Sequence, residues 1–175
     1  MNKERISETD ETIPTEVQDH LTGEHAITDI GQLVLFIVFV LIMVLDKFIF
    51  HYSLNAIGTL PVIVSMPVFV ILFLSGVFLI NQSYRVIFGK EKKKSGFVQE
   101  GVFRLVRHPM YTGSMLLFLS FVILSYSILA LGVWVFICVF YYFVSKHEEK
   151  LLYLKLGQTY QNYKNEVPMF IPFWK

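Results

Sequence analysis

The feature that most constrains the fold is a long uncharged stretch, Met115 to Val144, which contains no Asp, Glu, Lys, Arg or His. As one helix it would be roughly 45 Å long, whereas the hydrocarbon core of a membrane is only about 30 Å thick. The triplet Ser125-Tyr126-Ser127 offers a polar break within the stretch. We therefore predict two antiparallel helices, a hairpin over residues 109–146 that leaves one membrane face and returns to it.

Polar clusters flank this hairpin on both sides. Arg107-His108-Pro109-Met110-Tyr111-Thr112-Gly113 precedes it, and Glu148-Glu149 follows it. Because both helices of a hairpin have their outer ends on the same side of the membrane, the two clusters are predicted to lie side by side at one surface.

The charges of the chain are unevenly distributed. Residues 1–29 carry eight acidic and two basic residues, and residues 30–175 carry six acidic and thirteen basic ones. The acidic tail has no basic segment leading into an apolar one, so it is not expected to be a signal peptide; its composition is typical of a solvated, disordered extension. The predicted fold is an all-α integral membrane protein with about four transmembrane helices, of which the hairpin forms the last two.

The first two membrane helices are predicted within residues 30–81, at about 30–50 and 60–81, joined by a linker. Asp46 and Lys47 fall near the end of the first helix, where charged side chains can extend to the membrane interface. Pro67 lies inside the second helix and is expected to kink it.

Basic residues gather between Gln82 and His108. By the positive-inside rule this segment and both termini are predicted to be cytoplasmic. The lysines between Lys90 and Lys94 are interpreted as a topology determinant next to anionic membrane lipids. No aromatic-interleaved basic surface accompanies them, so a nucleic-acid partner is not expected.

The third membrane helix is predicted to begin at Pro109. The residue before a proline is pushed into an extended conformation, and proline is favoured at the first helical position. The positive end of the helix dipole, with Arg104 and Arg107 beside it, suits an anionic group of a ligand, although the arginines alone would equally suit lipid phosphates.

The fourth helix is predicted to continue beyond the membrane. Its spacing assigns Tyr141, Ser145, Glu148 and Leu152 to one face, and Tyr142, Lys146, Glu149 and Tyr153 to the next. A carboxylate opposite a positive helix end suits a zwitterionic ligand. No metal site is predicted, because the five histidines are scattered, and Cys138, the single cysteine, is interpreted as a packing residue.

These motifs in combination resemble the isoprenylcysteine carboxyl methyltransferase and phospholipid methyltransferase superfamily. The resemblance covers residues 82–175 and rests on the following motifs: Arg-His-Pro-x-Tyr-x-Gly at 107–113, the apolar hairpin, Glu148-Glu149 with Leu152, Gly157 with Tyr160 and Tyr163, and Val167-Pro168. It implies an integral membrane enzyme that uses S-adenosylmethionine, with a cytosolic cofactor-binding region at the C-terminal side.

By that resemblance, Arg107, Tyr111 and Glu148 are the expected catalytic residues. Methyl transfer to an acceptor requires mainly alignment and desolvation, so no general base is assigned. The aromatic faces of Phe103 and Tyr111 can attract the sulfonium cation. The expected cofactor-binding residues are Ser95, Gly96, Phe97, Val98, Phe103, His108, Pro109, Met110, Tyr111, Glu148 and Glu149.

The acceptor is expected to be a lipophilic small molecule or a lipidated group. Isoprenylcysteine methyltransferases tend to carry an arginine four residues before the first glutamate, and this chain has Val144 there. That difference leaves an amine, a thiol or another lipid-soluble acceptor open. Two alternatives also remain: an NADPH-dependent sterol-type reductase, which shares the Arg-His-Pro motif, and a membrane scaffold without enzymatic activity.

Overall fold

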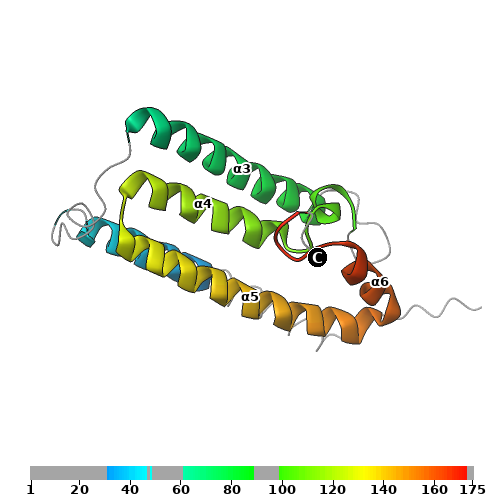
Figure 1. The fold of residues 1–175 in the computed structure, drawn as a ribbon. Coiled ribbons are helices and arrows are strands. Elements are labelled where there is room, and N and C mark those ends of the chain that lie inside the picture. Colours follow the sequence, from blue (N-terminus) through cyan, green and yellow to red (C-terminus); the bar gives the residue numbers. More distant parts are fainter. Residues whose placement is uncertain (1–30, 47, 49–60, 89–98, 173–175) are drawn as a thin grey trace, which may run out of the picture. The chain divides into compact units, whose positions relative to one another are not determined.

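The computed structural model describes residues 31–46, 48, 61–88 and 99–172, and every regular element within them is helical (Figure 1). The all-α prediction is therefore confirmed for this part of the chain. The elements are an N-terminal helix Gly31–Leu45, α3 (Val62–Phe88), the short 3-10 helix η2 (Gly101–Arg104), α4 (Pro109–Ser125), α5 (Ile128–Leu156) and α6 (Gln158–Glu166).

The chain divides into two compact units, Met1–Val38 and Phe39–Lys175. In the first unit, the described residues are the first turns of the Gly31–Leu45 helix. The second unit holds α3 to α6 and both polar clusters. The remaining description concerns this second unit.

Helix α3 is longer than the apolar pattern predicted. Its end was expected near Asn81, but it continues to Phe88. The residues after Asn81 contain no glycine or proline until Gly89, and each added helical residue forms a further backbone hydrogen bond at little cost. Pro67 lies inside α3 without ending it.

Helices α3 and α4 pack closely because two glycines meet between them. A Cβ atom added to Gly76 would lie 2.8 Å from the carbonyl oxygen of Gly113, and one added to Gly113 would lie 2.9 Å from that of Gly76. Small residues at such contacts let two membrane helices approach along their backbones. Further along, the rings of Phe69 and Phe73 pack against Phe121.

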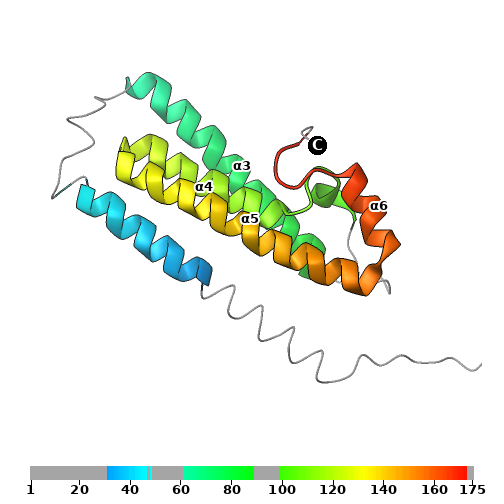
Figure 2. The ribbon, with the colours of Figure 1, turned by 60° about the horizontal axis from the view of Figure 1, so that its bottom comes forward.

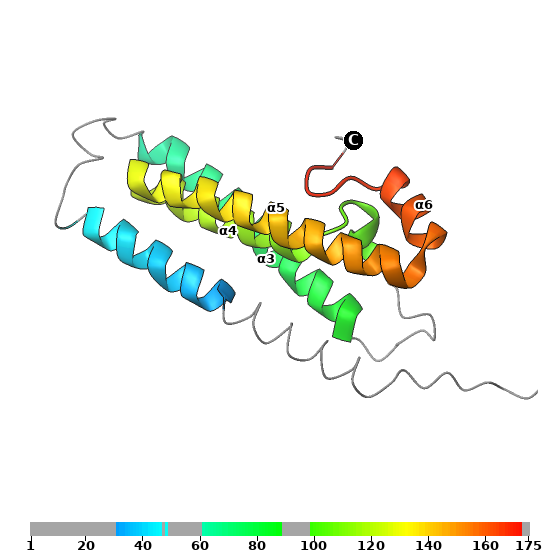
Figure 3. The ribbon, with the colours of Figure 1, turned by 90° about the horizontal axis from the view of Figure 1, so that it is seen from below.

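The turn of the predicted hairpin is Tyr126-Ser127, within the triplet that the sequence singled out. Tyr126 has a left-handed backbone conformation (φ 54°), and its N–H donates to the carbonyl of Val122, which ends α4. The Ser127 hydroxyl accepts from the Ala130 N–H and so caps α5. Helices α4 and α5 therefore run antiparallel, with α3 also beside α4 (Figures 1 and 3).

Two helices are long and apolar enough to cross a membrane, Val62–Ile87 and Ile128–Leu156. Only 11% and 22% of their most apolar windows are buried, so these are not the enclosed core helices of a water-soluble domain. The helices Gly31–Leu45 and Pro109–Ser125 are apolar but shorter. Two long apolar helices are thus present among the described residues, and four complete spans remain a prediction.

Asp46 lies beside the turn of the hairpin. Its side chain is only 2% exposed, and the Ser127 hydroxyl at the turn donates a hydrogen bond to its carboxylate. The sequence pattern did not show this polar partner, and the position of Asp46 at a membrane interface remains a prediction.

After α5 the chain reverses at Gly157 and returns along α6 toward the start of α4 (Figure 2). Gly157 has a positive φ of 54°, a conformation that side-chain-bearing residues rarely adopt. Tyr160, Tyr163 and Val167 form a small buried cluster against Leu152 and Leu156 of α5. This cluster fixes α6 beside the end of α5 that carries the glutamates.

Candidate active site

Helix α4 begins at Pro109, as predicted. His108 before it has φ −122° and ψ 64°, which is outside the helical region but is not the extended conformation that was expected. The His108 carbonyl accepts hydrogen bonds from both the N–H (3.0 Å) and the hydroxyl (3.0 Å) of Thr112. These bonds fix the backbone at His108 and hold its ring, which is 8% exposed, at the entrance of the helix.

The two glutamates of α5 lie in different environments, and the sequence pattern did not predict that Glu149 would be the buried one. The buried stripe of α5 is Tyr141, Ser145 and Glu149, whereas Tyr142 and Tyr153, which were expected to share the face of Glu149, are 44% and 50% exposed. Glu149 is 2% exposed, but the Glu148 side chain is 40% exposed.

Glu149 is the centre of a buried charge cluster. Its Oε1 lies 2.8 Å from Nη2 of Arg107 and 3.5 Å from Nε2 of His108, and its Oε2 lies 3.1 Å from Nζ of Lys164. A carboxylate with little access to water requires such partners, because an unpaired buried charge is costly. Glu149 therefore joins the start of α4 to α6, and it does not pair with the neighbouring lysines of its own helix.

Glu148 lies toward the solvent-accessible side of the same cluster. The Tyr111 hydroxyl donates a hydrogen bond to Oε1 of Glu148, and Nδ1 of His108 lies 3.6 Å from Oε2. The predicted residues Tyr111, His108 and Glu148 are thus brought together, 37 and 40 residues apart in the chain, at one end of the hairpin.

The carboxylates beside the His108 ring favour its charged form. Burial by itself lowers the pKa of His108, but the carboxylates of Glu148 and Glu149 raise it more, so the pKa lies above its ordinary value of 6.5. The ring also stacks near Tyr111 (centroids 5.9 Å apart), and Tyr111 stacks on Tyr141 at 4.9 Å. The resulting aromatic column leads from the charge cluster into the apolar part of the hairpin.

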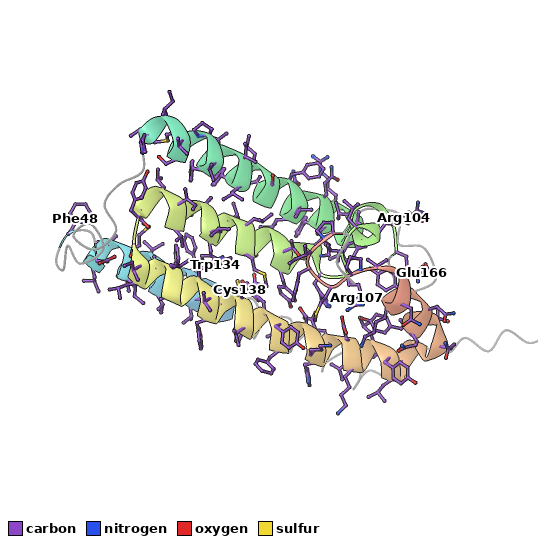
Figure 4. The ribbon with its side chains drawn as sticks, viewed as in Figure 1. Phe48, Arg104, Arg107, Trp134, Cys138 and Glu166 are labelled. Atoms are coloured by element: carbon purple, nitrogen blue, oxygen red, sulfur yellow. The ribbon has the colours of Figure 1, made fainter. Side chains whose placement is uncertain are left out.

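Arg107, whose side chain is labelled in Figure 4, donates hydrogen bonds to backbone carbonyls within the protein. Its Nη1 donates to the carbonyls of Lys164 (2.8 Å) and Val167 (3.0 Å), and its backbone N–H donates to that of Pro168 (2.9 Å). Its side chain is 9% exposed. Its expected role as a ligand for a cofactor carboxylate remains a prediction, but its present contacts fasten the segment after α6 to the start of α4.

Helix α6 and the segment after it contribute contacts that the sequence did not predict. The His108 N–H donates to the Met169 carbonyl (3.2 Å), and the Tyr163 hydroxyl donates to the Phe103 carbonyl (2.7 Å). Burial raises the pKa of Tyr163 to about 12, so this hydroxyl remains protonated near neutral pH. The motifs at Tyr163 and Val167-Pro168 signalled that this segment matters, but not which residues it contacts.

The remaining predicted residues have mixed outcomes. Ser95, Gly96, Phe97 and Val98 lie outside the described residues. Phe103 and Met110 are partly exposed near the cluster, and Pro109 is buried in the first turn of α4. In the described part of the chain, no group of three His, Cys, Asp or Glu residues is arranged to hold a metal ion.

Two observations test whether S-adenosylmethionine fits this site. The Ser145 hydroxyl is wholly buried one turn before Glu149 and has no hydrogen-bond partner among the described residues. The Glu148 carboxylate is partly open and can accept further hydrogen bonds. These groups fit a ligand that carries an ammonium group and hydroxyl groups, as S-adenosylmethionine does. Glu148 would hold the ammonium or the ribose hydroxyls, and the bound cofactor would supply an activated methyl group.

The fold and the site together define a class of protein. It is all-helical, has long apolar helices, and carries a charge cluster at one end of a helical hairpin. The family model for phospholipid methyltransferase matches residues 56–159. The chain belongs to this integral membrane family, whose methyltransferases use S-adenosylmethionine.

Two curated relatives carry the same name, methanethiol S-methyltransferase. The protein from Crocosphaera subtropica is 35% identical over 126 residues, which cover 71% of this chain and 47% of the relative. The protein from Pseudomonas sp. (strain GM41(2012)) is 33% identical over 90 residues, covering 46% of this chain and 30% of the relative. The chain therefore spans about half the length, or less, of these relatives. No solved structure matches it.

Proposed function

We propose that this protein is a membrane-embedded methyltransferase that transfers a methyl group from S-adenosylmethionine to a small lipophilic acceptor, with a thiol as the favoured class. The proposal rests mainly on one observation: Glu148 is in contact with both Tyr111 and His108 at the end of the hairpin. These are the residues to which the family resemblance assigns the cofactor, and they come from separate parts of the chain.

The thiol class is favoured by two independent observations. The matched relatives are named for the methylation of methanethiol, which is a small apolar thiol. In addition, Val144 occupies the position where isoprenylcysteine methyltransferases tend to place an arginine for the substrate carboxylate. Since an uncharged acceptor needs no such cation, an apolar thiol is compatible with valine at this position.

The chemistry proposed is an in-line displacement. The acceptor sulfur forms a bond to the methyl carbon, the bond between that carbon and the sulfonium sulfur breaks, and the thiol proton is released. The chain's own contribution is binding and alignment: Glu148 fixes the donor, Tyr111 and His108 hold Glu148 in place, and the apolar hairpin excludes water from the reacting atoms.

The orientation follows from the charge pattern. We place the charge cluster at the cytoplasmic surface, with four membrane spans and both termini in the cytoplasm. The cofactor then enters from the cytosol and the lipophilic acceptor from the bilayer.

The decisive experiment measures binding and turnover of the purified full chain in detergent or lipid nanodiscs. Isothermal titration with S-adenosylhomocysteine should show binding, and titration with NADPH should not. Labelled methyl transfer from the cofactor to methanethiol should give labelled dimethyl sulfide. Binding of NADPH alone would favour a reductase, and binding of neither would favour a scaffold.

A matched pair of variants tests the site itself. Glu148→Gln should weaken binding of S-adenosylhomocysteine by about 1.5–3 kcal/mol, the size of a hydrogen bond to a charged group. Glu166→Gln makes the same chemical change at an exposed position of α6 and should leave affinity unchanged. If the two variants bound S-adenosylhomocysteine with equal affinity, Glu148 would not be part of the cofactor site.

A further inference from the structure

A second polar feature adjoins the proposed methyltransferase site at the end of α5. It is a groove of about 270 Å³ between α5 and α6. The lining residues are Lys146, Glu149, Lys150, Tyr153, Tyr160, Gln161 and Lys164. Glu148, Tyr111 and His108 do not line the groove, but Glu149, one of the expected cofactor-binding residues, does, so the groove adjoins the proposed cofactor site and shares one wall residue with it.

The groove is strongly basic. Three lysines and one glutamate line it, and the glutamate is Glu149, which already has Arg107 and Lys164 as partners. Lys146 and Lys150 are exposed, and neither has an ion pair within the described part of the chain. Lys146 and Lys150 therefore line a concave surface whose one carboxylate, Glu149, is already paired with Arg107 and Lys164, and this excess of positive charge favours an anionic ligand.

The position of the groove along α5 argues for a lipid. The uncharged part of the helix ends at Val144, and Lys146 is the next charged residue. The Lys146 ammonium lies 5.5 Å from the ring of Tyr142, and Tyr153 lines the groove one turn after Lys150. Tyrosine and lysine at the end of an apolar helix are typical of the level of the lipid headgroups.

We propose that this groove binds the phosphate headgroup of an anionic phospholipid from the adjoining leaflet. Lys146 and Lys150 pair with the phosphate, and the tyrosine rings pack beside the glycerol region. This inference requires that α5 crosses the membrane, but it does not depend on the methyl-transfer activity. The proposed site is specific to α5 and α6 and is distinct from the non-specific contact that any membrane protein makes with its bilayer.

The test uses the full chain in nanodiscs that contain phosphatidylcholine alone or phosphatidylcholine with phosphatidylglycerol. Native mass spectrometry should detect retained phosphatidylglycerol in preference to phosphatidylcholine. Lys146→Gln with Lys150→Gln should weaken retention roughly thirtyfold, about fivefold for each lysine near a membrane surface. Lys155→Gln removes the same charge from an exposed residue of α5 outside the groove and should change retention little.

Three results would overturn the proposal. One is equal retention of the two lipids by the unaltered protein. Another is an equal loss in the Lys155→Gln control, since that would indicate a general charge effect. The third is displacement of the lipid by excess inorganic phosphate, since that would indicate a site for free phosphate. Unchanged binding of S-adenosylhomocysteine by the double variant would show that it is folded and that the two sites are distinct.

Discussion

Nη2 of Arg107 lies 2.8 Å from Oε1 of Glu149, and both side chains are almost inaccessible to water. This ion pair links the first residue of the Arg-His-Pro motif to the second glutamate of the Glu-Glu motif. Lys164 extends the link to α6 through the other oxygen of Glu149. The two motifs therefore contain a buried ion pair, Arg107 and Glu149, beside the group around Glu148 that is proposed to bind the cofactor.

Removing the charge of Glu149 should destabilise the protein. Glu149→Gln would leave Arg107 and Lys164 without their shared carboxylate, and breaking a buried pair costs about 3–5 kcal/mol. Thermal unfolding in detergent should show the loss. Glu148→Gln alters a half-exposed carboxylate and should cost clearly less stability; equal losses would contradict the division of roles between the two glutamates.

Arg107→Lys distinguishes a structural arginine from a ligand-binding one. Lysine keeps the charge, but one ammonium group cannot reach Glu149 and the carbonyls of Lys164 and Val167 at the same time. We expect a loss of about 1–3 kcal/mol in stability, as for buried carbonyls left without donors. Affinity for S-adenosylhomocysteine, measured below the unfolding temperature, should change little. A large loss of affinity in a stably folded variant would instead place Arg107 on the cofactor.

The glycine contact between α3 and α4 predicts a packing defect. Gly113→Ala would place a Cβ within 2.8 Å of Cγ1 of Ile80 and 2.9 Å of the Gly76 carbonyl, so the helices must separate. Overpacking of this kind costs about 1–3 kcal/mol. Gly132→Ala on α5 meets nothing within 4 Å and should be neutral or slightly stabilising. Similar melting temperatures for the two variants would show that α3 and α4 do not approach at Gly113.

The raised pKa of His108 predicts a pH dependence. Below the ordinary pKa of 6.5, the charged ring contributes its full ion-pair stabilisation with Glu148 and Glu149. This contribution is lost as the pH rises through the higher pKa of the folded protein. The stability difference between wild type and His108→Gln should therefore be largest in mild acid and shrink on the alkaline side. A difference that grows with pH would mean that the ring is neutral in the folded protein.

The hairpin and the start of α4 were predictable because they depend on local signals. An overlong uncharged stretch with a polar triplet requires a turn, and proline after His108 marks a helix start. The environments of the two glutamates were not predictable. On a helix, positions 148 and 149 lie about 60° to one side and about 40° to the other side of Ser145. Local spacing cannot choose between them, and the choice depends on Arg107 and Lys164, which are distant in sequence.

The contacts of residues 163–170 with the start of α4 have a consequence for truncation. Arg107 finds both carbonyl acceptors of its Nη1, those of Lys164 and Val167, beyond the end of α5. A chain shortened before Lys164 would keep both helices of the hairpin but would leave this buried guanidinium without those acceptors.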